Sequence, residues 1–194
     1  MSQNIEIEFK NLLTEAEFTA LKTYFLFADA DFKKQENHYF DTVNFALKAK
    51  GCALRIREKN GQYEMTLKQP AKEGLLETNQ TLSSEEAALI LQTGTIISGE
   101  VKSALKKLKV EPDSLQYFGS LTTERAEKYF KDGLIVLDFS YYLNTCDFEI
   151  EYEVNDYDRG KKFFEELLQE MQIPLRETAN KIKRFYLRKQ NTSL

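Results

Sequence analysis

Residues 4–11 read Asn-Ile-Glu-Ile-Glu-Phe-Lys-Asn, and apolar and charged side chains alternate strictly along this segment. The apolar members share one face of an extended chain and the charged members share the other: Ile5, Ile7 and Phe9 against Glu6, Glu8 and Lys10. A period of two predicts a β-strand with one buried apolar face. The opposite face carries full charges, and the rest of the sequence repeats this arrangement.

Similar alternation predicts further strands along the chain, at residues 35–41, 52–59, 62–69, 73–81, 116–130, 134–141 and 147–154. Asn60-Gly61 joins two of them and is a strong signal for a tight hairpin. Helical spacing and capping residues predict helices that begin at Thr14 and that cover about 83–92, 101–109, 159–171 and 178–188. The expected fold is therefore α+β, with about eight strands that are mostly connected by hairpins.

The charged faces of these strands carry like charges in pairs, such as Glu6 with Glu8 and Arg55 with Arg57. Glu149, Glu151 and Glu153 repeat the pattern near the C-terminus. One interpretation is an open sheet with a solvated face. The other is a sheet that closes with its charged faces inward, since eight strands can form a barrel around a lumen. Carboxylates bind hard divalent cations, and Arg and Lys bind phosphate oxygens, so such a lumen suits a metal-bound polyanion.

Composition excludes several classes of protein. The 194 residues suit one domain over 1–194, and the formal net charge of −4 argues against a nucleic-acid binder. No apolar stretch approaches the ~20 residues of a membrane span. The beginning of the chain lacks the features of a secretory signal, and it has two cysteines, so we expect a cytoplasmic protein with reduced thiols. A histidine-based mechanism would rest on His38 alone, and its parity, opposite to that of Asp41, predicts that it faces outward.

The segment Glu6-Ile7-Glu8-Phe9-Lys10 resembles the ExExK signature of the CYTH domain, or triphosphate tunnel metalloenzyme, family. The motifs that follow resemble that family in their order: Tyr39-Phe40-Asp41-Thr42, Leu54-Arg55-Ile56-Arg57, Thr66-Leu67-Lys68, Glu77, Glu124-Arg125, Leu137-Asp138, residues 149–153 and Asn180-Lys181. The resemblance implies a closed eight-stranded antiparallel tunnel flanked by helices. It also implies hydrolysis of inorganic or thiamine triphosphate, or cyclisation of ATP, with Mg²⁺ or Mn²⁺.

The resemblance also assigns roles to residues. The metal-binding carboxylates would be Glu6 and Glu8 together with Glu151 and a partner chosen between Glu149 and Glu153. The phosphate-binding bases would be Lys10, Arg55, Arg57, Lys68, Arg125 and Lys181, with Arg184 as a second choice on the helical face of Lys181. Either Glu77 or Asp138 would accept a proton, and Tyr39 and Asp41 are further candidates for the site. Two positions depart from the family pattern, with Asn180 where many members have Ser and Asn79 where an acidic residue is common.

The expected function is metal-dependent hydrolysis of a small molecule that contains a triphosphate, with inorganic triphosphate first. Adenylate cyclisation of the class IV type and hydrolysis of thiamine triphosphate are alternatives within the resemblance. A non-catalytic polyphosphate- or nucleotide-binding module is an alternative of another class, although a pure anion binder gains nothing from a site lined with Glu. A structural protein with a solvated sheet is the simplest alternative. A homodimer is compatible with the resemblance.

Overall fold

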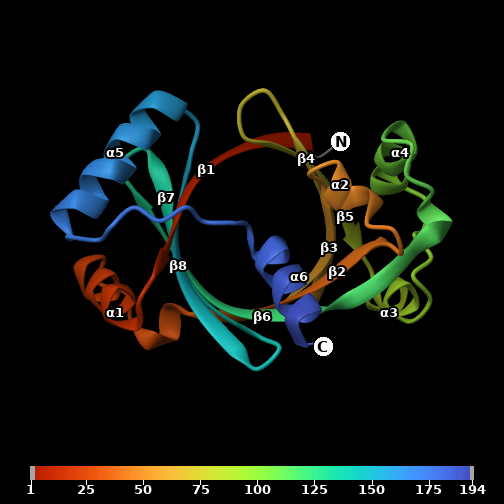
Figure 1. Ribbon diagram of the computed structural model, residues 1–194, viewed down its shortest axis with the longest axis horizontal. Coiled ribbons are helices and arrows are strands. Elements are labelled where there is room, and N and C mark those ends of the chain that lie inside the picture. Colours follow the sequence, from red (N-terminus) through yellow and green to blue (C-terminus); the bar gives the residue numbers. More distant parts are fainter. Residues whose placement is uncertain (1–2, 193–194) are drawn as a thin grey trace. The chain divides into compact units, whose positions relative to one another are not determined.

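The computed structural model describes residues 3–192, and the side chains of residues 3–189 (Figure 1). Every strand that alternation predicts is present. The strands are β1 (Gln3–Leu13), β2 (Lys33–Thr42), β3 (Ala53–Lys59), β4 (Gln62–Pro70), β5 (Leu75–Leu82), β6 (Leu115–Phe130), β7 (Gly133–Tyr142) and β8 (Thr145–Val154). Their order is β1-β5-β4-β3-β2-β6-β7-β8 in a closed barrel, which confirms the predicted fold class and decides between the closed and the open sheet.

The helices are α1 (Glu15–Tyr24), α2 (Ala46–Ala49), α3 (Ser84–Thr93), α4 (Glu100–Lys107), α5 (Tyr157–Glu170) and α6 (Lys181–Thr192). Short 3-10 turns occupy Asp29–Asp31 and Pro112–Ser114. α1 begins with the predicted capping box, in which the Thr14 side chain accepts from the Glu17 N–H and the Glu17 carboxylate accepts from the Thr14 N–H. None of the helices among residues 3–192 is long and apolar enough to cross a membrane.

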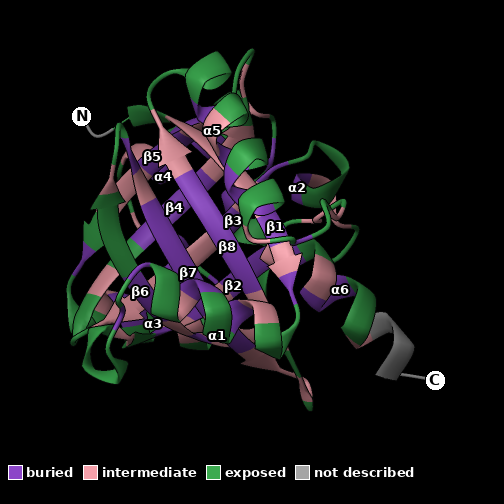
Figure 2. Ribbon diagram, turned by 90° about the vertical axis from the view of Figure 1, so that its left-hand side faces the viewer, coloured by how far each residue is buried: buried purple, intermediate pink, exposed green. Residues whose placement is uncertain are grey.

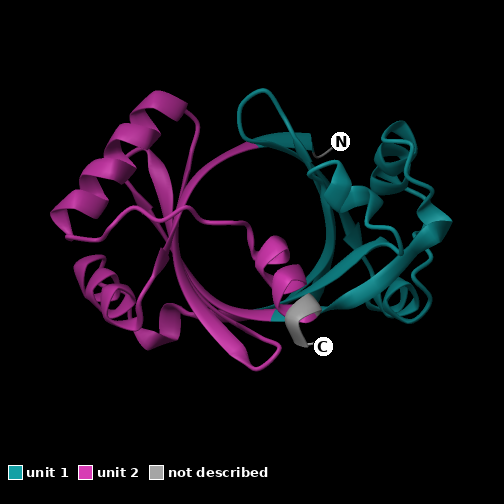
Figure 3. Ribbon diagram, viewed as in Figure 1, with its two compact units in different colours: residues 1–5, 35–121 teal, residues 6–34, 122–194 magenta. Residues whose placement is uncertain are grey.

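The structure divides into two compact units (Figure 3). Of the described residues, unit 1 comprises 3–5 and 35–121, and unit 2 comprises 6–34 and 122–192. The divisions after Ile5 and after Leu121 fall inside β1 and β6 rather than in loops.

In unit 1, α2, α3 and α4 cover the apolar face of the sheet. Ile56 and Met65 lie opposite each other on β3 and β4, and both are fully buried in this core. The neighbours of Ile56 in the sequence, Arg55 and Arg57, have the opposite parity and lie on the other face. The β3–β4 hairpin turns at Asn60-Gly61, whose φ angles of 54° and 74° are the positive values that the predicted tight turn requires.

In unit 2, α1 and α5 pack on β8, and Figure 2 shows this strand buried beneath them. Ile150 and Tyr152 face these helices, whereas Glu149 and Glu151 alternate with them on the opposite face. Phe164 and other aromatic residues of α1 and α5 fill the layer between the helices and the sheet. The sequence pattern therefore fixes which face of each strand is apolar, and the helices cover that face.

α2 was not expected from the sequence. The Asp41 carboxylate holds it in place, since Oδ1 accepts from the Leu47 N–H at 2.9 Å and Oδ2 accepts from the Lys48 N–H at 3.0 Å. Phe45 precedes the helix with a φ of 57°. A helix of four residues is too short to give a helical period in the sequence.

Replacement of Ile56 by Ala should destabilise the protein by about 2–5 kcal/mol, because the side chain is fully buried among close-packed apolar neighbours. Val43→Ala is the matched control, since Val43 is 67% exposed in the same unit and should change stability by no more than about 0.5 kcal/mol. Urea unfolding of the three proteins measures both effects. Equal losses in the two variants would contradict the assignment of this face to the core.

Candidate active site

The charged face of unit 2, opposite to the face that packs on α1 and α5, holds a buried ionic network. Arg125 on β6 lies directly opposite Asp138 on β7. Its Nε and Nη2 donate to Asp138 Oδ1 and Oδ2 at 2.7 and 2.6 Å, and Nη2 also donates to Glu151 Oε2 at 2.6 Å. Asp138 is 0% and Glu151 is 4% exposed. Arg125 therefore bridges two buried carboxylates from neighbouring strands.

α6 contributes a second base to the same network. Lys181 is the first residue of α6, and its Nζ lies 2.6 Å from Glu149 Oε1, 2.6 Å from Glu151 Oε1 and 2.8 Å from Asp138 Oδ2. Arg184, one turn later, places Nη1 2.6 Å from Glu149 Oε2. The structure thus brings Lys181 and Arg184 to one group of carboxylates, as their helical spacing predicts.

Charge neutralisation decides the protonation states in this network. Burial alone would lower the pKa of Lys181, but Asp138 and the nearby glutamates outweigh it and hold that pKa well above its usual value. The Arg125 pKa is raised in the same way. Burial raises the pKa of Asp138, yet the Arg125 and Lys181 charges outweigh burial and lower it. Both bases and Asp138 are therefore charged at neutral pH.

A cluster of carboxylates at the edge of this network lacks the same compensation. Burial, together with repulsion from Glu151, Glu6 and Glu8, raises the pKa of Glu153 to about 7 in spite of the nearby Arg125 charge. A divalent cation at this cluster would remove the repulsion. The donors are all carboxylate oxygens, the ligands that Mg²⁺ and Mn²⁺ prefer, so the residues present fit such an ion.

Lys10 shares the charged face with these glutamates. The antiparallel register places Lys10 opposite Glu151 and Glu8 opposite Glu153. Lys10 forms an ion pair with Glu8. Burial lowers the pKa of Lys10, but Glu8 and the glutamates of β8 outweigh burial, and the net shift is upward.

The charged face of unit 1 carries the second set of expected residues. Arg55 and Arg57 alternate on β3, and Lys68 on β4 lies opposite Glu77 on β5. Lys68 Nζ is 2.6 Å from Glu77 Oε1. Arg57 Nε donates to Asn37 Oδ1 at 3.1 Å, which fixes the guanidinium along the sheet.

Tyr39 and Asp41 have different environments. Tyr39 is 4% exposed and lies opposite Arg55 in the β2–β3 register, so it belongs to the charged face of unit 1. Asp41 is buried, and its carboxylate serves the backbone of α2 as described above. Asn79, where the family pattern often has an acid, donates to Asn4 Oδ1 at 3.2 Å.

Each unit thus gathers its own share of the expected residues. Unit 2 holds Glu6, Glu8, Lys10, Arg125, Asp138, Glu149, Glu151, Glu153, Lys181 and Arg184, and unit 1 holds Tyr39, Asp41, Arg55, Arg57, Lys68 and Glu77.

Sequence reasoning missed two polar residues that orient the bases. Asn37 accepts from Arg57, and Asp147 accepts from Arg184 Nε at 3.0 Å and from the Tyr142 hydroxyl at 2.8 Å. Asp147 precedes Glu149 by two positions in the alternating run of β8, so its parity could have identified it.

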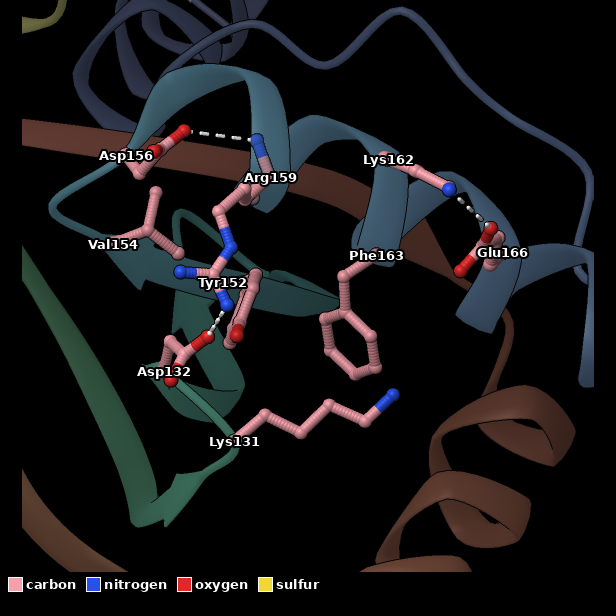
Figure 4. Close-up of a pocket in the computed structure, with 10 residues that line it drawn as sticks. Lys131, Asp132, Tyr152, Val154, Asp156, Arg159, Lys162, Phe163 and Glu166 are labelled. Atoms are coloured by element: carbon pink, nitrogen blue, oxygen red, sulfur yellow. Dashed lines mark hydrogen bonds and ion pairs between the residues drawn. The ribbon is translucent and has the colours of Figure 1, made fainter.

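A surface pocket of about 290 Å³ lies elsewhere on unit 2, between α5 and the β6–β7 turn (Figure 4). Its three acidic and three basic side chains balance in charge. Arg159 pairs with Asp132, and Lys162 lies 3.9 Å from Glu166. Tyr152, which lines it, belongs to the face of β8 that packs on the helices, so the pocket is separate from the charged face of unit 2.

The strands form a closed antiparallel barrel. Each strand has an apolar face covered by helices and an opposite face with carboxylates and bases. The protein is therefore a β-barrel of the class whose strands carry a charged face. The model of the CYTH domain matches residues 4–186, and the chain belongs to this family. It is 54% identical over 192 residues to a Bacillus subtilis (strain 168) protein named "Putative triphosphatase YjbK", covering 99% of this chain and 100% of that protein.

Two solved structures have the same fold. A Bacillus halodurans protein, described as a "putative adenylate cyclase", is 44% identical, with a TM-score of 0.93 over 96% of this chain and 100% of that chain. HpAC1 from Hippeastrum is 23% identical, with a TM-score of 0.76 over 94% of this chain and 95% of that chain.

Replacement of Lys181 by Met should cost about 3–5 kcal/mol of stability at neutral pH, because buried Asp138 and Glu149 would each lose a cationic partner. Lys183→Met is the matched control, since Lys183 is exposed on the same helix. Chemical denaturation of both variants tests the point. A loss as small as that of the control would mean that the network does not depend on Lys181.

Replacement of Glu153 by Gln should stabilise the metal-free protein at pH 8 by about 1–3 kcal/mol. The raised pKa of about 7 means that the folded state disfavours the charged carboxylate, so the penalty is present above this pKa and disappears toward pH 4.5. Thermal melts in chelator should show a much larger gain at pH 8 than at pH 5, where only part of the penalty remains. Glu165→Gln, at an exposed position on α5, should give no gain at either pH; an equal gain at both pH values for Glu153→Gln would contradict the electrostatic cause.

Proposed function

We propose that the protein is a divalent-metal-dependent triphosphatase that acts on inorganic triphosphate. The observation that supports this most directly is the carboxylate cluster of Glu6, Glu8 and Glu153, in which Glu8 lies opposite Glu153. Burial, together with repulsion from the neighbouring carboxylates, raises the pKa of Glu153. A site for an anion alone would not concentrate carboxylates beside its bases. A site for a metal-bound polyanion requires both.

The names of two relatives point to two reactions. YjbK, 54% identical, is named a triphosphatase, and the Bacillus halodurans protein, 44% identical, is described as an adenylate cyclase. Both reactions begin with a triphosphate group. The metal carboxylates and phosphate-binding bases proposed here would serve either one, so the choice depends on which nucleophile attacks.

We propose that the charged faces of the strands line the inside of the closed barrel. Glu6 and Glu8, with Glu151 and either Glu149 or Glu153, would hold Mg²⁺ or Mn²⁺. A bound divalent cation supplies positive charge to phosphate oxygens and stabilises the charge that develops during transfer. The contacts of Glu149 and Glu151 with Lys181, and the position of Glu153 near Glu6 and Glu8, favour Glu153 as the partner.

The bases would bind and align the triphosphate. Arg55 and Arg57 alternate on one strand, so their guanidinium groups can bind different phosphates of one chain. Guanidinium groups bind phosphate oxygens in bidentate fashion. Lys68, Lys10, Arg125, Lys181 and Arg184 would complete the set. Asn37 and Asp147 position Arg57 and Arg184 through the hydrogen bonds described above.

The attacking water must give up a proton. Of the two expected acceptors, Glu77 suits this role better than Asp138. Asp138 is held by Arg125 and Lys181, which lower its pKa and weaken it as a base. Glu77 Oε1 lies 2.6 Å from Lys68 Nζ. We therefore propose that Glu77 accepts the proton of the attacking water. Asp138 would orient Arg125 and Lys181.

Three broader assignments belong to the same proposal. Because β1 and β6 run through both units, we propose that residues 1–194 act as one domain. Because Cys52 and Cys146 are both free thiols, we propose the cytoplasm as the place of action. We propose that the protein binds a small triphosphate rather than a nucleic acid or a membrane. We also propose that it can form a homodimer.

A substrate panel tests the reaction. With Mg²⁺ or Mn²⁺, the protein should release phosphate from inorganic triphosphate faster than from thiamine triphosphate or ATP, and chelation should abolish the reaction. Formation of a cyclic nucleotide and pyrophosphate from ATP would instead support the cyclase. Tight binding of triphosphate without turnover of any substrate would support the non-catalytic module.

Arg55→Ala should lower kcat/KM for triphosphate by about 10- to 100-fold, because a charge-assisted hydrogen bond is worth about 1.5–3 kcal/mol. Arg159→Ala is the control, since the Arg159 side chain is 72% exposed beside the surface pocket on α5. Steady-state phosphate release measures both variants. Equal activity in the two variants would remove Arg55 from the substrate site.

A further inference from the structure

Three potential metal ligands gather on the face of unit 1 opposite to Arg55 and Arg57. Glu36 and His38 lie on β2 and Glu58 lies on β3, and one ligand atom of each residue lies within 4.8 Å of the others. All three side chains are half-buried. The parity of the strands separates them from the charged face of unit 1, as the sequence predicts for His38.

The strand register holds two of these ligands together. Glu36 and Glu58 are directly opposite each other in the β2–β3 pair. Like charges at such positions are destabilising, so the fold keeps two carboxylates in an unfavourable arrangement that a cation would relieve. His38 follows Glu36 by two residues and lies on the same face of β2. Backbone pairing, rather than a mobile loop, therefore fixes the spacing of the group.

The surroundings of His38 are those of a ligating imidazole. Its Nδ1 lies 3.3 Å from the Tyr117 hydroxyl on β6. A hydrogen bond at one ring nitrogen leaves Nε2 for a metal, the arrangement found in most histidine-ligated sites.

We propose that Glu36, His38 and Glu58 form a second metal site, which binds a divalent transition metal such as Zn²⁺ and is separate from the triphosphate site. One imidazole with two carboxylates suits Zn²⁺, whereas Mg²⁺ and Ca²⁺ favour oxygen ligands alone. Three protein ligands leave the fourth position of a tetrahedral ion to water or a small ligand.

A metal ion bound to Glu36, His38 and Glu58 would cross-link β2 and β3. Asn37 and Arg57, which neighbour these ligands in the sequence, form a hydrogen bond on the charged face of unit 1. A bound ion would therefore fix the two strands that carry Arg57 and its partner, and it should raise the melting temperature of the protein.

The single histidine of the chain makes the site directly observable. Chain without a histidine tag is titrated with ZnCl₂ in excess MgCl₂, which competes for the carboxylate cluster of unit 2, and the imidazole signals of His38 are followed by NMR. Stoichiometric Zn²⁺ should shift these signals and fix the ring in one tautomer. Tyr117→Phe should weaken binding by about 10- to 100-fold, the usual effect of removing a partner of a ligating histidine.

The double variant Glu36→Gln and Glu58→Gln should weaken Zn²⁺ binding at His38 at least as strongly as Tyr117→Phe. Glu111→Gln, at an exposed position in the same unit, should leave it unchanged. Imidazole signals that stay constant at millimolar Zn²⁺ would overturn the proposal. Shifts that persist at the same Zn²⁺ concentration in the double variant would also overturn it, since His38 would then bind alone. Triphosphatase activity enters neither measurement, so the result does not depend on the proposed function.

Discussion

The mutual neutralisation of buried charges on the charged face of unit 2 is the constraint on which the other features depend. Asp138 is fully buried, and an isolated carboxylate could not remain ionised there. Arg125 and Lys181 compensate its charge at 2.6 and 2.8 Å. Hydrophobic residues at these positions could give equal or greater stability, so stability alone does not explain the network, and binding is the role that we propose for it.

Strand alternation allows one sheet to perform two tasks. The apolar face of each strand packs against helices and supplies the stability, as Ile56 does in unit 1 and Ile150 does in unit 2. The opposite face is then available for charged side chains that a solvated loop could not hold in fixed positions. Arg55, the neighbour of Ile56 in the sequence, lies on this charged face. A single change of strand register would exchange the two faces.

The sequence was most informative where the pattern is local. Alternation predicted β1 and the hairpin at Asn60-Gly61, because both depend on neighbouring residues. It could not predict α2, which depends on hydrogen bonds from Asp41 to a four-residue turn. Nor could it predict that Lys181 contacts Asp138, since 43 positions separate them and only the packing of α6 brings them together. The roles of the site residues came from the order of motifs rather than from any single pattern.

The central claim is that the charged faces bind a metal-bound triphosphate, and a comparison of thermal melts tests it most directly. Mg²⁺ with triphosphate at ~100 times its dissociation constant should add about 2.7 kcal/mol to the stability of the folded state. For a domain of this size, this corresponds to a rise of about 5–10 °C in Tm. Mg²⁺ with monophosphate at the same concentration should give a much smaller rise, because monophosphate reaches fewer of the bases. Equal rises would mean that the site binds a single phosphate, and they would contradict the account.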